Sequence, residues 1–85
     1  MRSIIFHQTA FEQFSNWTRE NPKIAKKIVE LIEATIKDPF SGIGKPEALK
    51  HQLSGCWSRR ISEEHRLVYQ VTPESILILS CKFHY

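Results

Sequence analysis

The sequence has little cysteine and no long apolar run. Two cysteines in 85 residues are too few for a disulfide-stapled secreted scaffold, so both thiols are expected to be reduced. No hydrophobic stretch approaches the ~18 residues that cross a bilayer, and residues 1–10 lack the apolar segment of a secretion signal. These absences predict a cytoplasmic protein that does not associate with membranes.

Paired metal-ligand spacings and nucleophile motifs are also missing. The four histidines and two cysteines occur singly, and no serine or cysteine has a convincing base and orienting partner. We therefore expect no metal site, no cofactor and no acyl-transfer chemistry.

The basic residues that are present cluster in one stretch. The length fits one domain over residues 1–85, with 12 Lys and Arg against 9 Asp and Glu, a net charge of +3. Residues 45–60 alone carry four basic side chains and one acidic one. This stretch is predicted to bind a polyanion such as RNA, and the alternative is a charged strand edge that resists aggregation. The four basic residues are Lys45, Lys50, Arg59 and Arg60.

The first half of the chain has the pattern of a short strand and two amphipathic helices. A β-prone run at residues 3–7 precedes Thr9 and Glu12, whose spacing is that of a capping box and predicts a helix over residues 10–20. Asn21-Pro22 then predicts the start of a second helix that ends near Lys37. One face of the first helix is predicted to be core and carries Phe11, Phe14 and Trp17.

The second half is β-rich. Three runs separated by short polar turns predict an antiparallel meander, and a fourth strand is predicted to pair with the first of them. The three runs are residues 56–61, 66–71 and 75–83, and the fourth is 48–53. The predicted fold is α+β: β-α-α followed by an antiparallel β-meander, with two helices packed on one sheet face.

A meander brings the ends of neighbouring strands together. Arg59 and Arg60 end one predicted strand, Arg66 begins the next, and His84 and Tyr85 follow the last. If residues 48–53 form the hairpin partner, Glu47 joins the same edge of the sheet. A carboxylate, guanidinium groups, an imidazole and a phenol would then meet around one point.

Such a set of groups can cut RNA without a metal. The 2′-hydroxyl of RNA attacks the neighbouring phosphate when one group removes its proton and another protonates the leaving 5′-oxygen. Glu47 is the candidate base, His84 the candidate acid and Arg66 the candidate phosphate ligand. Tyr85 is a candidate to stack on a base or to donate to phosphate.

Each of these residues also has a purely structural interpretation. For Glu47 the alternative is an exposed ion pair with Lys45 or Lys50. For Arg66 it is pairing with Glu63 or Glu64 at the strand edge, and for His84 it is a frayed chain end.

Four segments resemble the YoeB (Txe/YoeB) toxins of the RelE/ParE superfamily. They are Gly44 to His51 (GKPEALKH), Leu53 to Ile61 (LSGCWSRRI), Glu64 to Tyr69 (EHRLVY) and the closing His84-Tyr85. The resemblance covers essentially the whole chain. It departs at Cys56, where relatives often carry an aromatic residue, and at Phe83, where tyrosine is common.

This resemblance implies a RelE-like fold and a ribosome-dependent endoribonuclease that cuts mRNA in the ribosomal A site. It assigns the general base to Glu47, the phosphate-stabilising arginine to Arg66, the general acid to His84 and the terminal tyrosine to Tyr85. Lys50 and Arg60 match supporting basic positions.

The resemblance further implies a homodimeric toxin that is inhibited by a YefM/Phd-type antitoxin, in a complex that binds its own operator DNA. Two other functions remain as alternatives. One is a non-catalytic ParE-like toxin that binds a protein target such as gyrase, and the other is a basic nucleic-acid-binding module.

Overall fold

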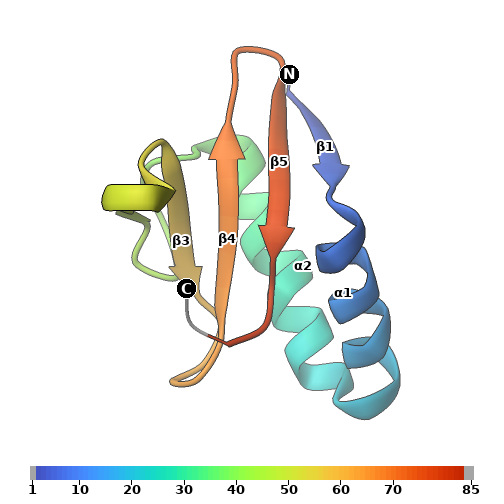
Figure 1. Cartoon of the computed structure of the whole chain (residues 1–85). Coiled ribbons are helices and arrows are strands. Elements are labelled where there is room, and N and C mark those ends of the chain that lie inside the picture. Colours follow the sequence, from blue (N-terminus) through green and yellow to red (C-terminus); the bar gives the residue numbers. More distant parts are fainter. Residues whose placement is uncertain (1, 84–85) are drawn as a thin grey trace.

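A computed structural model describes residues 2–83 of the chain. Two helices lie on one face of a five-stranded sheet (Figure 1). The helices are α1 (Gln8–Glu20) and α2 (Pro22–Lys37). The strands are β1 (Ser3–Phe6), β2 (Glu47–Ala48), β3 (Cys56–Arg60), β4 (Arg66–Val71) and β5 (Ser75–Ser80), and a short 3-10 helix spans His51–Leu53.

The sheet contains the predicted meander and two further strands, β1 and β2, which lie at its two edges. Strand order is β1-β5-β4-β3-β2, with β3, β4 and β5 antiparallel in sequence. Strand β1 pairs parallel with β5, and the two helices connect β1 with β2 at the opposite edge of the sheet. The α+β prediction is therefore confirmed, and the complete sheet is mixed.

Helix α1 starts two residues earlier than predicted, and the predicted capping box is wrong. The N-cap is His7, whose side chain accepts a hydrogen bond from the Thr9 amide at 3.2 Å. Trp17 is buried as expected, whereas Phe11 is 58% exposed, so the prediction of Phe11 as core is also wrong. Its ring packs edge-on against Phe6, at the margin of the sheet.

Four predicted strands are shorter than expected, and two of them, β1 and β3, lack only the last predicted residue. Within residues 48–53 only Ala48 is strand, where β2 pairs with β3, and a 3-10 helix follows. The last strand ends at Ser80, not at Phe83, because the backbone of Cys81 bonds to side chains of α1. Helix α2 has the predicted bounds.

The main core lies between the helices and the sheet. Ile28 and Leu31 of α2 pack with Leu67, Tyr69 and the inward residues of β5. A smaller apolar cluster on the opposite face contains Leu49, Cys56 and Val68. Since successive residues of a strand point to opposite faces, these two clusters define which side chains of β3 and β4 face the helices and which face away from them.

The core position of Cys81 has a chemical consequence. Its side chain is fully buried, and burial raises the pKa of the Cys81 thiol well above its ordinary value, to about 12. Its protonated form therefore contributes stability that is present at neutral pH and is lost as the pH rises toward 12.

We expect Cys81 to resist alkylation at pH 8, because only the thiolate reacts. In a Cys56→Ala variant, iodoacetamide labelling followed by mass spectrometry should leave the folded protein unmodified and modify it completely in urea. Rapid stoichiometric labelling of the folded protein would contradict this assignment.

Candidate active site

Two arginines face each other at the end of the meander. Arg60 ends β3 and Arg66 begins β4, and they are direct register partners. Their strand neighbours Leu67 and Tyr69 belong to the core under the helices, so alternation places Arg60 and Arg66 on the open face. Like charges placed directly opposite each other repel, so an anion bound between them would be stabilised.

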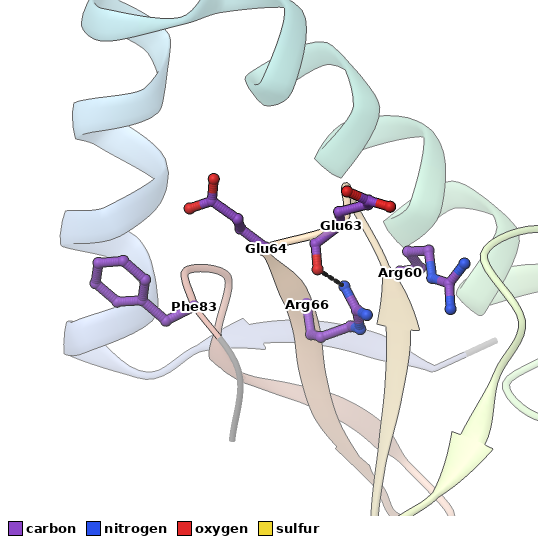
Figure 2. Close-up of a pocket in the computed structure, with 5 residues that line it drawn as sticks. All are labelled: Arg60, Glu63, Glu64, Arg66 and Phe83. Atoms are coloured by element: carbon purple, nitrogen blue, oxygen red, sulfur yellow. Dashed lines mark hydrogen bonds between the residues drawn. The ribbon is translucent and has the colours of Figure 1, made fainter.

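A pocket of about 540 Å³ surrounds this arginine pair. Figure 2 shows Arg66 between the end of β3 and the chain that follows β5. The Arg66 amide donates to the carbonyl oxygen of Phe83 at 3.2 Å, which joins the two segments. The pocket lining consists of Arg60, Glu63, Glu64, Arg66 and Phe83.

The β3–β4 turn holds the guanidinium group of Arg66. Its Nη1 atom donates to the backbone carbonyls of Ser62, of Glu63 at 3.1 Å and of His65 at 3.0 Å. Because a guanidinium carries five N–H donors in one plane, anchoring through Nη1 is compatible with phosphate binding through the other nitrogens. The turn therefore orients a cation before any ligand arrives.

Glu47 lies on the same face as the arginine pair. In the β2–β3 pairing it is opposite Ser58, and Ser58 and Arg60 are two residues apart on one face of β3. Glu47 is exposed. Because adjacent strands are about 4.8 Å apart, β2 and β4 are separated by about 10 Å, a gap that the side chains of Glu47 and Arg66 can span around a bound phosphate.

Glycine at position 44 brings the loop before Glu47 against β3. The Arg60 amide donates to the Gly44 carbonyl at 2.6 Å. Gly44 has φ +81, and a Cβ there would lie 2.7 Å from Leu31 Cδ2. Only glycine combines this backbone conformation with so close an approach, so it fixes where β2 begins.

Arg59 does not belong to this site, which corrects its prediction as a phosphate-binding residue. Its side chain is fully buried on the helix side of the sheet, whereas Arg60 lies on the open face. Its Nη1 donates to the Ile43 carbonyl at 2.9 Å, its Nη2 to the Ser41 carbonyl at 2.9 Å and to the Asp38 carbonyl. Arg59 therefore holds the loop between α2 and β2 and has no surface to offer to RNA.

Tyr69 completes this internal network. Arg59 Nε donates to Tyr69 Oη at 3.2 Å, and that hydroxyl donates to the Pro39 carbonyl at 2.7 Å. Burial raises the pKa of Tyr69, opposed in part by its hydrogen bond from Arg59. The pKa of Asp38 is lowered by the hydroxyl of Ser41 and the amide of Phe40, which donate to its carboxylate.

The other predicted residues fall in two groups. Lys45 precedes β2 and Lys50 follows it in the sequence, and both side chains are exposed. His84 and Tyr85 lie outside the described residues. Phe83, the residue before them, is described and contacts Arg66 as stated above.

The described part of the chain shows neither a metal site nor a membrane-spanning helix. Within residues 2–83, no cluster of three or more His, Cys, Asp and Glu side chains could hold a metal ion. Over the same residues, neither helix has the length and apolar character needed to cross a membrane.

Sequence reasoning missed one residue of this region and assigned another to the wrong face of the sheet. His65 is buried beside the site and accepts a hydrogen bond from the Phe83 amide, a role that no sequence motif indicates. The buried position of Arg59 had a usable signal, since strand alternation from Leu67 and Tyr69 already places Arg59 and Arg60 on opposite faces.

Solved structures of known toxins share this fold over the whole chain. A dimer of the toxin YoeB from Staphylococcus aureus is 46% identical and matches with a TM-score of 0.92, covering 99% of this chain and 98% of that one. The same organism's YoeB in complex with YefM is 46% identical, with a TM-score of 0.90 and coverage of 100% and 99%. The fold is thus that of a small RelE-like toxin.

Sequence comparison narrows this class to one family. The model of "YoeB-like toxin of bacterial type II toxin-antitoxin system" matches residues 6–85. Toxin YoeB of Escherichia coli K12 is 52% identical over 82 residues, which is 96% of this chain and 98% of that protein. The chain belongs to the YoeB-like family of type II toxins.

Proposed function

We propose that this toxin is an endoribonuclease that cuts messenger RNA in the A site of the ribosome. The observation that supports this most strongly is the Arg60–Arg66 register pair, which shares an open sheet face with the Glu47 carboxylate. A phosphodiester placed between these groups would have cations at its oxygens and a proton acceptor at its side.

The proposed reaction uses the substrate's own 2′-hydroxyl. Glu47 takes the 2′-hydroxyl proton, and the 2′-oxygen forms a bond to phosphorus. The bond from phosphorus to the 5′-oxygen breaks, and His84 gives that oxygen a proton. The products are a 2′,3′-cyclic phosphate and a 5′-hydroxyl, with no metal or cofactor required.

Arg66 would stabilise the charge that builds on the phosphate oxygens. Its preorientation by the turn carbonyls means that little reorganisation is needed during the reaction. Lys45, Lys50 and Arg60 would bind neighbouring phosphates, and Tyr85 would stack on a base.

The partners that we propose follow the relatives. The Staphylococcus aureus YoeB structures include a dimer and a complex with YefM. We propose that this chain likewise forms homodimers and binds a cognate YefM/Phd-type antitoxin, and that the complex binds operator DNA. Because ribosomes and mRNA are its targets, the toxin would act in the cytoplasm.

A single 2′-deoxy nucleotide at the cut site is expected to block cleavage, because it removes the attacking oxygen. The substrate is a short message on programmed ribosomes, with 5′ ends mapped with and without the toxin. The control message carries the same substitution several codons away and should be cut at the unmodified rate. Cleavage at the deoxy position would rule out the mechanism, and intact messages throughout would favour a ParE-like, non-catalytic toxin.

A further inference from the structure

His65 is a buried imidazole that the proposed reaction does not use. It is only 8% exposed and immediately precedes Arg66. Its ring packs edge-on against Trp17 of α1, with ring centroids 4.8 Å apart. A polar side chain in such a position is normally hydrogen-bonded, and the identity of its partner is informative.

That partner is the backbone of the segment after β5. The Phe83 amide donates to His65 Nδ1 at 2.8 Å, and the Arg66 amide donates to the Phe83 carbonyl at 3.2 Å. The rings of His65 and Phe83 also lie 5.5 Å apart. Two consecutive residues therefore hold both backbone polar groups of Phe83.

Phe83 needs this support because of its backbone conformation. Its φ is +61, in the left-handed region that non-glycine residues adopt only when surrounding contacts impose it. Phe83 lies beyond the end of β5, so the strand ladder cannot impose this conformation. Among the described residues, His65 and Arg66 make the backbone contacts that can impose this conformation on Phe83.

The residues just before Phe83 are held by α1. Trp17 Nε1 donates to the Cys81 carbonyl at 3.0 Å, and the Cys81 amide donates to Gln13 Oε1 at 2.7 Å. Lys82 Nζ lies 5.7 Å from the Trp17 ring. The chain is therefore held at Cys81 by side chains of α1 and at Phe83 by the side chain of His65.

We propose that His65 is a positioning residue: it fixes the backbone of Phe83, the residue to which the candidate acid His84 is bonded. This inference rests on the proposed function. Its physical basis is that the His84 nitrogen is bonded to the Phe83 carbonyl carbon, so rotation at Phe83 moves His84 by several ångströms. A displacement of about 1 Å can cost about 100-fold in rate.

The role requires Nδ1 of His65 to be a hydrogen-bond acceptor, which places the ring proton on Nε2. This requirement separates two substitutions. His65→Phe keeps a ring against Trp17 and loses the acceptor, whereas His65→Asn loses the ring and keeps an acceptor oxygen near the position of Nδ1.

The test compares both variants with the unmutated toxin on programmed ribosomes. For His65→Phe we expect kcat to fall about 10- to 100-fold with KM within about twofold, and the Phe83 amide to exchange its hydrogen about tenfold faster or more. His65→Asn should recover most of the kcat and most of the amide protection. Thermal unfolding and antitoxin binding are measured in parallel.

Each outcome decides the proposal. Unchanged protection of the Phe83 amide in His65→Phe would overturn the proposal. It would also be overturned if, in both His65→Phe and His65→Asn, the loss of kcat were in proportion to the loss of thermal stability. If the unmutated toxin cuts no message, the proposed function fails and the catalytic role of His65 with it. In that case, loss of Phe83 protection in His65→Phe would still show that His65 holds this backbone.

Discussion

Alanine at Glu47 or at His84 is expected to reduce ribosome-dependent mRNA cleavage by at least about 100-fold, because each proton-transfer step typically contributes 100- to 10,000-fold. Glu47→Ala removes the proposed acceptor of the 2′-hydroxyl proton, and His84→Ala removes the proposed proton donor to the leaving oxygen. Single-turnover cleavage of a defined message on ribosomes measures both rates.

The structure provides a matched control for the Glu47 substitution. Glu74 is also exposed, but it lies in the β4–β5 turn, where its backbone carbonyl accepts from the Ser3 amide. This turn is at the opposite end of the sheet from the β3–β4 turn (Figure 1). Glu74→Ala should therefore cleave within about twofold of the unmutated rate.

Thermal unfolding and antitoxin binding distinguish a chemical effect from a folding defect. Because the Glu47 side chain is exposed, its removal should change the free energy of unfolding by less than about 0.5 kcal/mol. Full cleavage and full toxicity in both Glu47→Ala and His84→Ala would refute the assignment of these residues.

Leucine in place of Arg59 is expected to lower the free energy of unfolding by about 3–5 kcal/mol. The substitution removes the donor of three part-buried hydrogen bonds, to the carbonyls of Asp38, Ser41 and Ile43. Each unsatisfied buried polar group costs about 1–3 kcal/mol, and partial rehydration of the loop limits the total. Urea unfolding followed by tryptophan fluorescence measures the loss.

Arg60 is the control for this experiment, since it has the same side chain one position along β3. It is exposed and faces Arg66, so Arg60→Leu should change stability by no more than about 0.5 kcal/mol. The free energy of unfolding of Arg59→Lys should lie between those of the two leucine variants, because one ammonium cannot reach all the carbonyls that a planar guanidinium bridges. Equal stability of Arg59→Leu and Arg60→Leu would contradict the structural role of Arg59.

The sequence was most informative where local chemistry sets the conformation. Asn21-Pro22 marks the start of α2, because proline suits the first turn of a helix. The helix ends at Lys37, and Asp38 is its C-cap. The turns between β3, β4 and β5 also fall where the polar residues predicted them. In contrast, the cap of α1 was assigned to Thr9, because a capping-box pattern does not reveal that a preceding histidine can accept the same amide hydrogen bond.

The candidate site was predicted in part. The meander brings Arg60 and Arg66 together, as short turns require, and Glu47 reaches the same face although β2 is only two residues long. The roles of Glu47, Arg66, His84 and Tyr85 in cleavage remain predictions, with the last two outside the described residues. Arg59 was wrongly grouped with Arg60 because net charge along a segment ignores which face each side chain occupies.

The sequence by itself determined the order of elements, the basic stretch and the set of candidate proton carriers, because helix periodicity, turn residues and side-chain chemistry act over a few neighbouring positions. Only the tertiary structure decided that Arg59 holds the loop between α2 and β2, that β1 lies parallel to β5 and that His65 holds Phe83. Each of these depends on segments far apart in the chain. Their contacts are set by how the helices pack on the sheet, and no local pattern encodes that packing.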